Sequence, residues 1–245
     1  MNELSEQLPT PDRVLTIGAH PDDAEFGAGG VLSKWSDRGC EASMLVMTDG
    51  SKGSWDPAAD QGDLVETRRA EQHRSASVLG ITGQVVMLGR VDGELEYSME
   101  LRETLCWWIR RLRPNVVITH DPWKRYMLHP DHRVTGLAAT DGVVAARDHL
   151  FFPTQLGSEI GKHRPDAVLY WQADEPDHRE NIAGYVDRKV SALLCHSSQT
   201  QTTMGDAGAS AAHRERFADR ITQRAVEVGK PGGLAAAEAF KLVVP

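Results

Sequence analysis

Two short motifs in this chain of 245 residues place histidine beside carboxylates. The first, "AHPDDAEFGAGG", covers residues 19–30, and the second, "LHPDHRVTG", covers residues 128–136. Both contain the order His-Pro-Asp. Imidazole nitrogens and carboxylate oxygens together suit zinc or a similar divalent ion. The two motifs therefore indicate a metal site that is assembled from distant parts of the chain.

The first motif alone leaves two interpretations open. Proline is suited to the first position of a helix, and residues three apart, such as His20 and Asp23, can converge on one point. The aspartates could equally cap the helix while His20 packs against its neighbours. The second copy, again before an expected helix and after an expected strand, favours the metal site, because capping does not explain the repetition.

A nucleotide site is excluded by the order of the residues. A dinucleotide fingerprint needs GxGxxG directly after the first strand. Here Gly18 is followed by Ala-His-Pro-Asp-Asp, and the later glycines lie at 27, 29 and 30. Adjacent carboxylates at a helix start would repel a phosphate. The P-loop pattern is also absent from the sequence.

Apolar runs and helical patterns alternate along the chain. Strands are expected at 13–19, 42–50, 84–89, 115–121 and 167–173, and helices at about 26–38, 62–79, 98–112, 131–147, 184–195 and 211–228. This alternation predicts an α/β fold, a Rossmann-like three-layer sandwich with a mostly parallel sheet and helices on both faces.

Ligands in such folds bind beyond the carboxyl ends of the strands. The polar residues at those positions are His20, Asp22, Asp23, Asp49, Asp92, His120 and Asp121. A third related motif, "PDHR" at 176–179, lacks the preceding histidine, and we expect a surface turn there.

Composition narrows the class of protein. A formal net charge of −8 argues against partners such as nucleic acid or anionic lipid. Three separated cysteines without a CxxC pattern indicate neither disulfides nor a cysteine zinc site. We expect one domain over 1–245 with a flexible tail at 1–12, no membrane segment, and a cytoplasmic location.

The chain resembles the PIG-L/LmbE-like family of zinc-dependent N-deacetylases. The resemblance rests on both HPD motifs and on "TDGSKG", "TRRAEQHRSASVLG", "LGRVDGEL" and "DRKVSALLCHSSQ". It implies that His20, Asp23 and His132 hold the metal, zinc or alternatively iron. It also implies that Asp22 is the general base and that His129 stabilises the tetrahedral intermediate. Substrate contacts are expected at Arg68, Asp92 and Tyr126.

The resemblance implies removal of the acetyl group from a small N-acetylglucosamine-type conjugate, by a chain that could form a homo-oligomer. In this chemistry the ion acidifies water and polarises the amide, while a free carboxylate moves the proton. An amidase of a larger N-acyl amino sugar or of a mycothiol-type thiol conjugate is the nearest alternative. A metal-binding or sugar-binding protein without catalysis is the alternative from another class.

Overall fold

A sheet of seven strands lies at the centre of the computed structural model, which describes residues 7–245. The strands are β1 (Arg13–Gly18), β2 (Glu41–Thr48), β3 (Val85–Arg90), β4 (Val116–His120), β5 (Ala167–Trp171), β6 (His178–Asn181) and β7 (Ala237–Val243). Their order is β3-β2-β1-β4-β5-β7-β6. The pairs among β1 to β5 are parallel, and β7 runs antiparallel to both of its neighbours.

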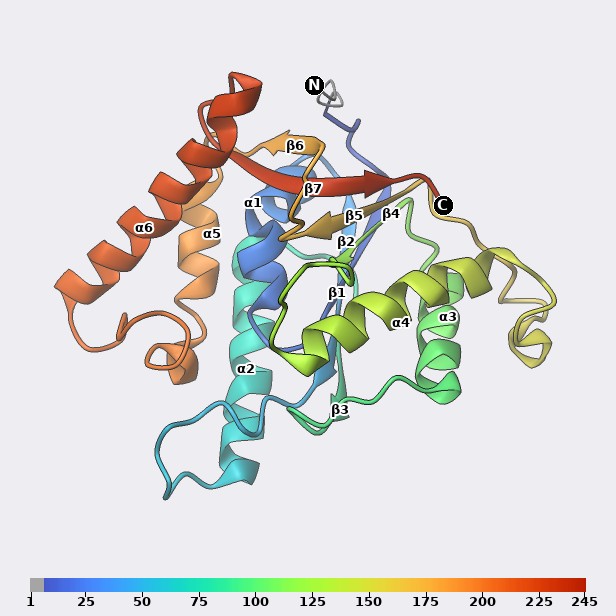
Figure 1. Ribbon diagram of the computed structural model, residues 1–245, viewed down its shortest axis with the longest axis horizontal. Helices are drawn as coiled ribbons and strands as arrows, with labels where there is room; N and C mark the ends of the chain where they lie inside the picture. Colours follow the sequence, from blue (N-terminus) through green and yellow to red (C-terminus); the bar gives the residue numbers. More distant parts are fainter. Residues whose placement is uncertain (1–6) are drawn as a thin grey trace.

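Helices cover both faces of the sheet (Figure 1). Within residues 7–245 the α-helices are α1 (Asp23–Asp37), α2 (Gln61–Leu79), α3 (Met99–Leu112), α4 (Pro130–Arg147), α5 (Val186–Leu193) and α6 (Ala211–Gly229). Short 3-10 turns are η1 (Pro153–Gln155), η2 (Ser197–Gln199) and η3 (Lys230–Gly232). The predicted α/β class, with a mostly parallel sheet and helices on both faces, is confirmed.

Two separate apolar cores follow from the alternation of side chains along the strands. Val14 of β1 packs in the core beneath α1, α2, α5 and α6, whereas Leu15 and Ile17 pack in the core beneath α3 and α4. Successive strand residues point to opposite faces, so a central strand must be apolar on both sides. This explains why the five parallel strands appear in the sequence as continuous apolar runs.

The prediction of a surface turn at 176–179 is wrong. His178 begins β6, is fully buried, and its Nε2 lies 2.9 Å from the Oε1 atom of Glu180. The strands β6 and β7 were not predicted, because β6 is polar and β7 is rich in alanine. Their positions depend on burial of ionic groups such as Glu180 and Glu238, which local sequence patterns do not reveal.

The order of the strands places a crevice beside the two HPD motifs. β1 and β4 are neighbours, yet β1 leads into α1 on one face and β4 leads through residues 121–129 into α4 on the other. Such a switch point leaves a space beyond the carboxyl ends of the two strands. His20 follows one of these ends, and His120 is the last residue of the other.

The predicted flexible tail falls partly on residues 1–6, which lie outside the described residues. From residue 7 onward the segment is packed, since the Leu8 amide donates to Glu180 and Gln7 accepts from Lys34. Among the helices of residues 7–245, none combines the length and the apolar character needed to span a bilayer.

Candidate metal centre

Three side chains from the two HPD motifs meet at one point. Nδ1 of His20 lies 3.1 Å from Nε2 of His132, and the Asp23 carboxylate lies 3.5 Å from the first nitrogen and 3.4 Å from the second. Ligands about 2.0–2.1 Å from a tetrahedral zinc ion stand about 3.3 Å from one another. The predicted ligands are therefore close enough together to share one ion.

Local backbone geometry produces this convergence. Asp22 has φ 95°, a left-handed conformation that is unusual for a residue with a side chain, and α1 begins at Asp23 directly after it. The metal motif thus forms the first turn of α1, earlier than the predicted start at residue 26. In the second motif α4 begins at Pro130, one residue before the predicted start at about 131, and His132 lies in its first turn.

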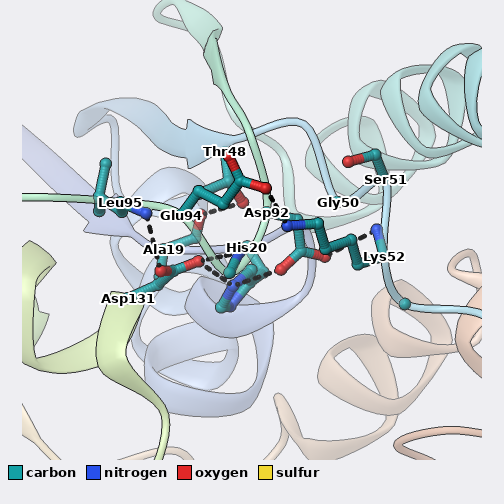
Figure 2. A network of polar contacts seen from close by, with 12 residues as sticks. Ala19, His20, Thr48, Gly50, Ser51, Lys52, Asp92, Glu94, Leu95 and Asp131 are labelled. Carbon is teal, nitrogen blue, oxygen red and sulfur yellow. Dashed lines mark hydrogen bonds and ion pairs between the residues drawn. The ribbon is translucent and has the colours of Figure 1, made fainter.

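The other nitrogen of His20 is held by carboxylates, as Figure 2 shows. Nε2 lies 3.0 Å from Asp131 and 3.3 Å from Asp92. Asp131 is fully buried and also accepts from the amides of Gly93 and Leu95. A histidine whose second nitrogen donates to a carboxylate is fixed in orientation, so Nδ1 of His20 faces the point where the three side chains meet.

His120 holds the carboxylate ligand in a similar way. The Trp171 indole donates to Nδ1 of His120 over 3.1 Å, and Nε2 lies 3.1 Å from Asp23. Nε2 of His120 also lies 3.3 Å from the Ala19 amide, so both ring nitrogens of His120 are engaged and the ring is held against Asp23. The sequence analysis noted His120 at the end of a strand, and the structure places it against a predicted ligand.

The electrostatics of the cluster favour a cation. Burial lowers the pKa of His20, but the three surrounding carboxylates outweigh it and raise that pKa to about 12. Burial and the neighbouring histidines lower the pKa of His132 to about 4, despite the opposing effect of Asp23. His132 is therefore neutral at pH 7, as a metal ligand must be.

Asp22 differs from its neighbour Asp23 although both are buried. Burial and the charge of Asp23 raise the pKa of Asp22 to about 7. Burial alone would raise the pKa of Asp23 too, but His120 and His132 hold it well below its ordinary value. One carboxylate thus stays ionised, and the other has a pKa near neutrality, which suits a general base.

His129 precedes α4 and lines the same cavity. Its ring centroid lies 4.4 Å from that of His20 and 4.9 Å from that of His132. Burial and the positive charge of His20 lower its pKa, so the free protein carries it neutral at pH 7. Its buried Nδ1 and that of His132 have no hydrogen-bond partner within residues 7–245.

Clusters that could hold a metal ion occur in three overlapping combinations among residues 7–245. These are His20 with His129 and His132; Asp23 with His120 and His132; and His20 with Asp92, His129 and Asp131. Histidine and carboxylate donors of this kind fit zinc, iron(II) or a similar divalent ion. The donor set and the spacing both fit a bound metal.

A cavity of about 760 Å³ opens beside this cluster. Arg68 and Asp92 line it, as do the side chains of Asp22 and His129. Arg68 is buried and donates to the carbonyls of Gly50 and Gly53 over 2.7 and 2.8 Å. A β-carbon at either glycine would lie 2.6 Å or less from this guanidinium, so the loop can close on Arg68 only with glycine there.

Not every predicted residue reaches the cavity. Tyr126 is 88% exposed, has φ 60°, and is absent from the cavity lining. Asp121 accepts from the amide of Trp123 within its own loop. His196, by contrast, is fully buried, with Nε2 3.4 Å from Glu25.

Sequence reasoning gave no role to three residues that contact the site motif, namely Asp131, Gln72 and Gln199. The repeated HPD pattern was a signal for Asp131, since this residue has the same position in the second motif as Asp22 has in the first. The glutamines carried no such signal.

Comparisons with known proteins agree with this geometry. The profile of the PIG-L family, described as GlcNAc-PI de-N-acetylase, matches residues 15–143. Diacetylchitobiose deacetylase of Thermococcus kodakarensis is 33% identical over 197 residues, which cover 80% of this chain and 73% of that protein. A probable N-acetyl-alpha-D-glucosaminyl L-malate deacetylase 2 of Bacillus anthracis is 28% identical over 202 residues, which cover 77% of this chain and 82% of that protein.

Solved structures show the same similarity over a longer span. The N,N'-diacetylchitobiose deacetylase from Pyrococcus horikoshii, solved with an inhibitor, superposes with a TM-score of 0.85 at 30% identity and covers 96% of this chain and 84% of that one. The match to the family profile spans both strands and both helix starts that build the cluster. The chain therefore belongs to the PIG-L family of de-N-acetylases.

Proposed function

We propose that this protein hydrolyses the acetamide of an N-acetylglucosamine-type conjugate and releases acetate and the free amine. The observation that carries the proposal is the convergence of His20, Asp23 and His132, with the unligated carboxylate of Asp22 beside them in one cavity. The names of the similar proteins, which include deacetylases of diacetylchitobiose and of a glucosaminyl malate, support this substrate class.

Zinc is the ion that we propose for the cluster, held by His20, Asp23 and His132. A bound divalent ion of this kind supplies Lewis acidity, which polarises the amide carbonyl and makes water a stronger nucleophile near pH 7. The carboxylates that orient His20 and the contact of His120 with Asp23 support the assignment, because ligands oriented in this way bind metals more tightly.

Asp22 is the proposed general base. Its raised pKa, about 7, suits a carboxylate that first accepts the proton of the attacking water and then gives it to the departing amine. Asp22 has a left-handed backbone conformation and lines the cavity beside the ligand set, in agreement with this role.

His129 is proposed to donate a hydrogen bond to the oxyanion as the amide carbon becomes tetrahedral. It lines the cavity on the same side as His132 and has an unused buried nitrogen. A neutral imidazole donates through only one nitrogen, so the tautomer matters here. Arg68 and Asp92 are proposed to contact the sugar hydroxyls, and the exposed Tyr126 would reach substrate only if its loop moved.

The experiment is acetate release from a panel of N-acetylglucosamine conjugates by the protein as purified, after chelation, and after zinc is restored. We expect turnover that is lost on chelation and recovered with zinc. Asp37→Asn, an exposed change at the far end of α1, is the control and should leave the rate unchanged. A chelated, metal-free protein that works at the full rate would rule the proposal out.

A larger acyl group is the second candidate, and one observation favours it. The cavity extends from the metal cluster along an apolar wall that includes Phe217 and Ile221 of α6. Rates on matched N-acetyl and N-octanoyl glucosamine distinguish the two functions. A higher kcat/KM for the octanoyl compound would favour the amidase, whereas the main proposal expects the acetyl compound to react faster.

A further inference from the structure

The peptide bond between Pro21 and Asp22 is held at both of its polar atoms by buried glutamines. The Asp22 amide donates to Oε1 of Gln72 over 3.3 Å, and Nε2 of Gln199 donates to the Pro21 carbonyl over 2.7 Å. Gln72 comes from α2 and Gln199 from η2, and both are at most 3% exposed. The orientation of this one peptide is therefore fixed from two sides.

That orientation matters because it determines the backbone torsion of the proposed base. Asp22 stands at φ 95° and ψ −21°, where a side chain normally costs energy that the surrounding structure must offset. Rotation of the Pro21–Asp22 peptide would carry Asp22 out of this conformation and move its carboxylate. The first turn of α1, which contains Asp23, starts at the next residue.

The orientation of the Gln72 amide is itself determined by its neighbours. Nε2 of Gln72 donates to Oε1 of Glu25 over 2.7 Å, and a carboxylate can only accept. Oε1 of Gln72 must therefore face the Asp22 amide. Glu25 is fully buried, accepts a second hydrogen bond from Ser75, and lies 3.4 Å from His196.

The segment that carries Gln199 is also held by a residue outside the HPDD turn, Glu71 of α2. Glu71 accepts from the Ser197 hydroxyl and from both the amide and the hydroxyl of Ser198. The backbone amide of Gln199 donates to the His196 carbonyl. The Thr203 hydroxyl lies 3.0 Å from the Gln199 carbonyl and 3.4 Å from the Asp22 carboxylate, and its single proton can be donated to one of them at a time. The sequence "HSSQ" thus forms a rigid support under the HPDD turn.

We infer that Gln72 and Gln199 are positioning residues for the deacetylation: together they clamp the Pro21–Asp22 peptide and so hold Asp22 in its left-handed conformation. The inference rests on the proposed function, since it assigns a purpose to the placement of the base. It also gives a role to the "LLCHSSQ" segment, in which the buried His196 lies 3.4 Å from Glu25 and directly precedes the turn that carries Gln199.

The test is to substitute each glutamine by methionine, which keeps the length of the side chain and removes the amide. Gln72→Met and Gln199→Met should each lower kcat at least tenfold while KM changes less than threefold and metal content stays at the wild-type level. Gln155→Met is the matched control: Gln155 also makes two partly buried hydrogen bonds, to Arg110 and Glu103, but lies far from the site in sequence and fold. It should lower the melting temperature without lowering kcat.

A crystal structure of Gln199→Met supplies a measurement that does not depend on activity. Asp22 should leave the left-handed region or occupy two conformations. If both methionine variants keep wild-type kcat and Asp22 keeps φ near its present value, the clamp is refuted. If Gln72→Met does not fold, Gln199→Met alone decides, because it releases the same peptide from the opposite side.

Failure of the proposed function looks different. If Asp22→Asn deacetylates as fast as wild type, the assignment of the base fails, while the torsion of Asp22 in Gln199→Met still tests the clamp. If Asp22→Asn is inactive but both methionine variants are fully active with unchanged torsions, the clamp fails and the base assignment stands.

Discussion

His20 touches more of the site than any other residue in the HPD motifs. One nitrogen faces His132 and Asp23, and the other faces Asp131 and Asp92. A ligand that is fixed at its far side loses little freedom when it binds an ion, so the partners behind it contribute to affinity.

Replacing Asp131 by asparagine tests this contribution. Asp131→Asn should weaken metal affinity by about 10- to 100-fold, the usual effect of losing a carboxylate behind a ligating histidine. Competition with a chelator of known affinity measures it. Asp141→Asn, on the exposed face of the same helix, serves as the control and should bind metal like wild type. Equal affinity in both variants would show that Asp131 does not support His20.

At the level of single residues, the HPD repeat was sufficient to predict that the two motifs lie together, and the family resemblance supplied His20, Asp23 and His132 as the set of neighbours. It could not identify which group faces the second nitrogen of His20. That depends on the rotation of α4 about its axis, which turns Asp131 toward His20 while His132 faces the cluster. The contacts of Gln72 and Gln199 with the HPDD turn could not be predicted either, because they depend on how the helices pack.

At the scale of elements, Arg110 of α3 closes the end of α4. It is buried and donates to the side chain of Gln155 and to the backbone carbonyls of Ala145, Ala146, Asp148, Phe151 and Phe152. The last carbonyls of a helix have no partners within the helix. One guanidinium therefore satisfies both the end of α4 and the loop that follows it.

Arg110→Met should lower the free energy of unfolding by about 3 kcal/mol or more, since each buried acceptor left unpaired costs roughly 1–3 kcal/mol. Denaturant unfolding measures the change. Arg111→Met, at the exposed neighbouring position, should cost no more than about 1 kcal/mol through loss of its contact with Trp107. Similar losses in the two variants would contradict the capping role of Arg110.

Glu180 of β6 provides a prediction about pH. Burial would raise its pKa, but hydrogen bonds from His178 and Lys34 hold it below the ordinary value of 4.5. A lowered folded-state pKa means that Glu180 contributes stability above the unfolded value and loses it as pH falls through the folded value. The stability difference between wild type and Glu180→Gln should therefore be constant from pH 7 to 6 and shrink from about pH 5 downward. A difference that grows with acidification would contradict this.

Elements were predictable to different degrees. The five parallel strands and the six helices follow from apolar runs and helical periodicity, because each buries apolar side chains of its own. β6 and β7 instead form an antiparallel edge that is held by buried ionic contacts, such as Glu238 with Lys189. Charged residues in a sequence normally indicate a solvent-exposed segment, so no pattern in the sequence predicted β6 and β7 as strands.

At the scale of the whole molecule, the candidate metal cluster brings together residues from the two helical layers that cover opposite faces of the sheet. His20 precedes α1 and Asp23 is its first residue, on one face of the sheet, and His132 belongs to α4 on the other. An ion held by all three would bind the folded state and not the unfolded chain. It should therefore stabilise both layers together.

Removal of the metal should accordingly lower the melting temperature. Because zinc would bind only the folded state, the free energy of unfolding should rise by about 4 kcal/mol when free zinc is a thousandfold above its dissociation constant. Calorimetry of chelated and zinc-loaded protein measures the shift, and Asp23→Ala is the control that should show none. A zinc-induced shift that persists in Asp23→Ala would place the ion elsewhere.

The division of labour between the adjacent aspartates is the central claim, and one measurement tests it most directly. Acetate release from an N-acetylglucosamine conjugate is compared between wild type and Asp22→Asn, with the zinc content of both proteins determined in the same samples. We predict equal zinc content and a kcat that is lower by about 10²–10⁴-fold in the variant, the usual contribution of a positioned base. A zinc-loaded Asp22→Asn protein that releases acetate at the wild-type rate would contradict the account.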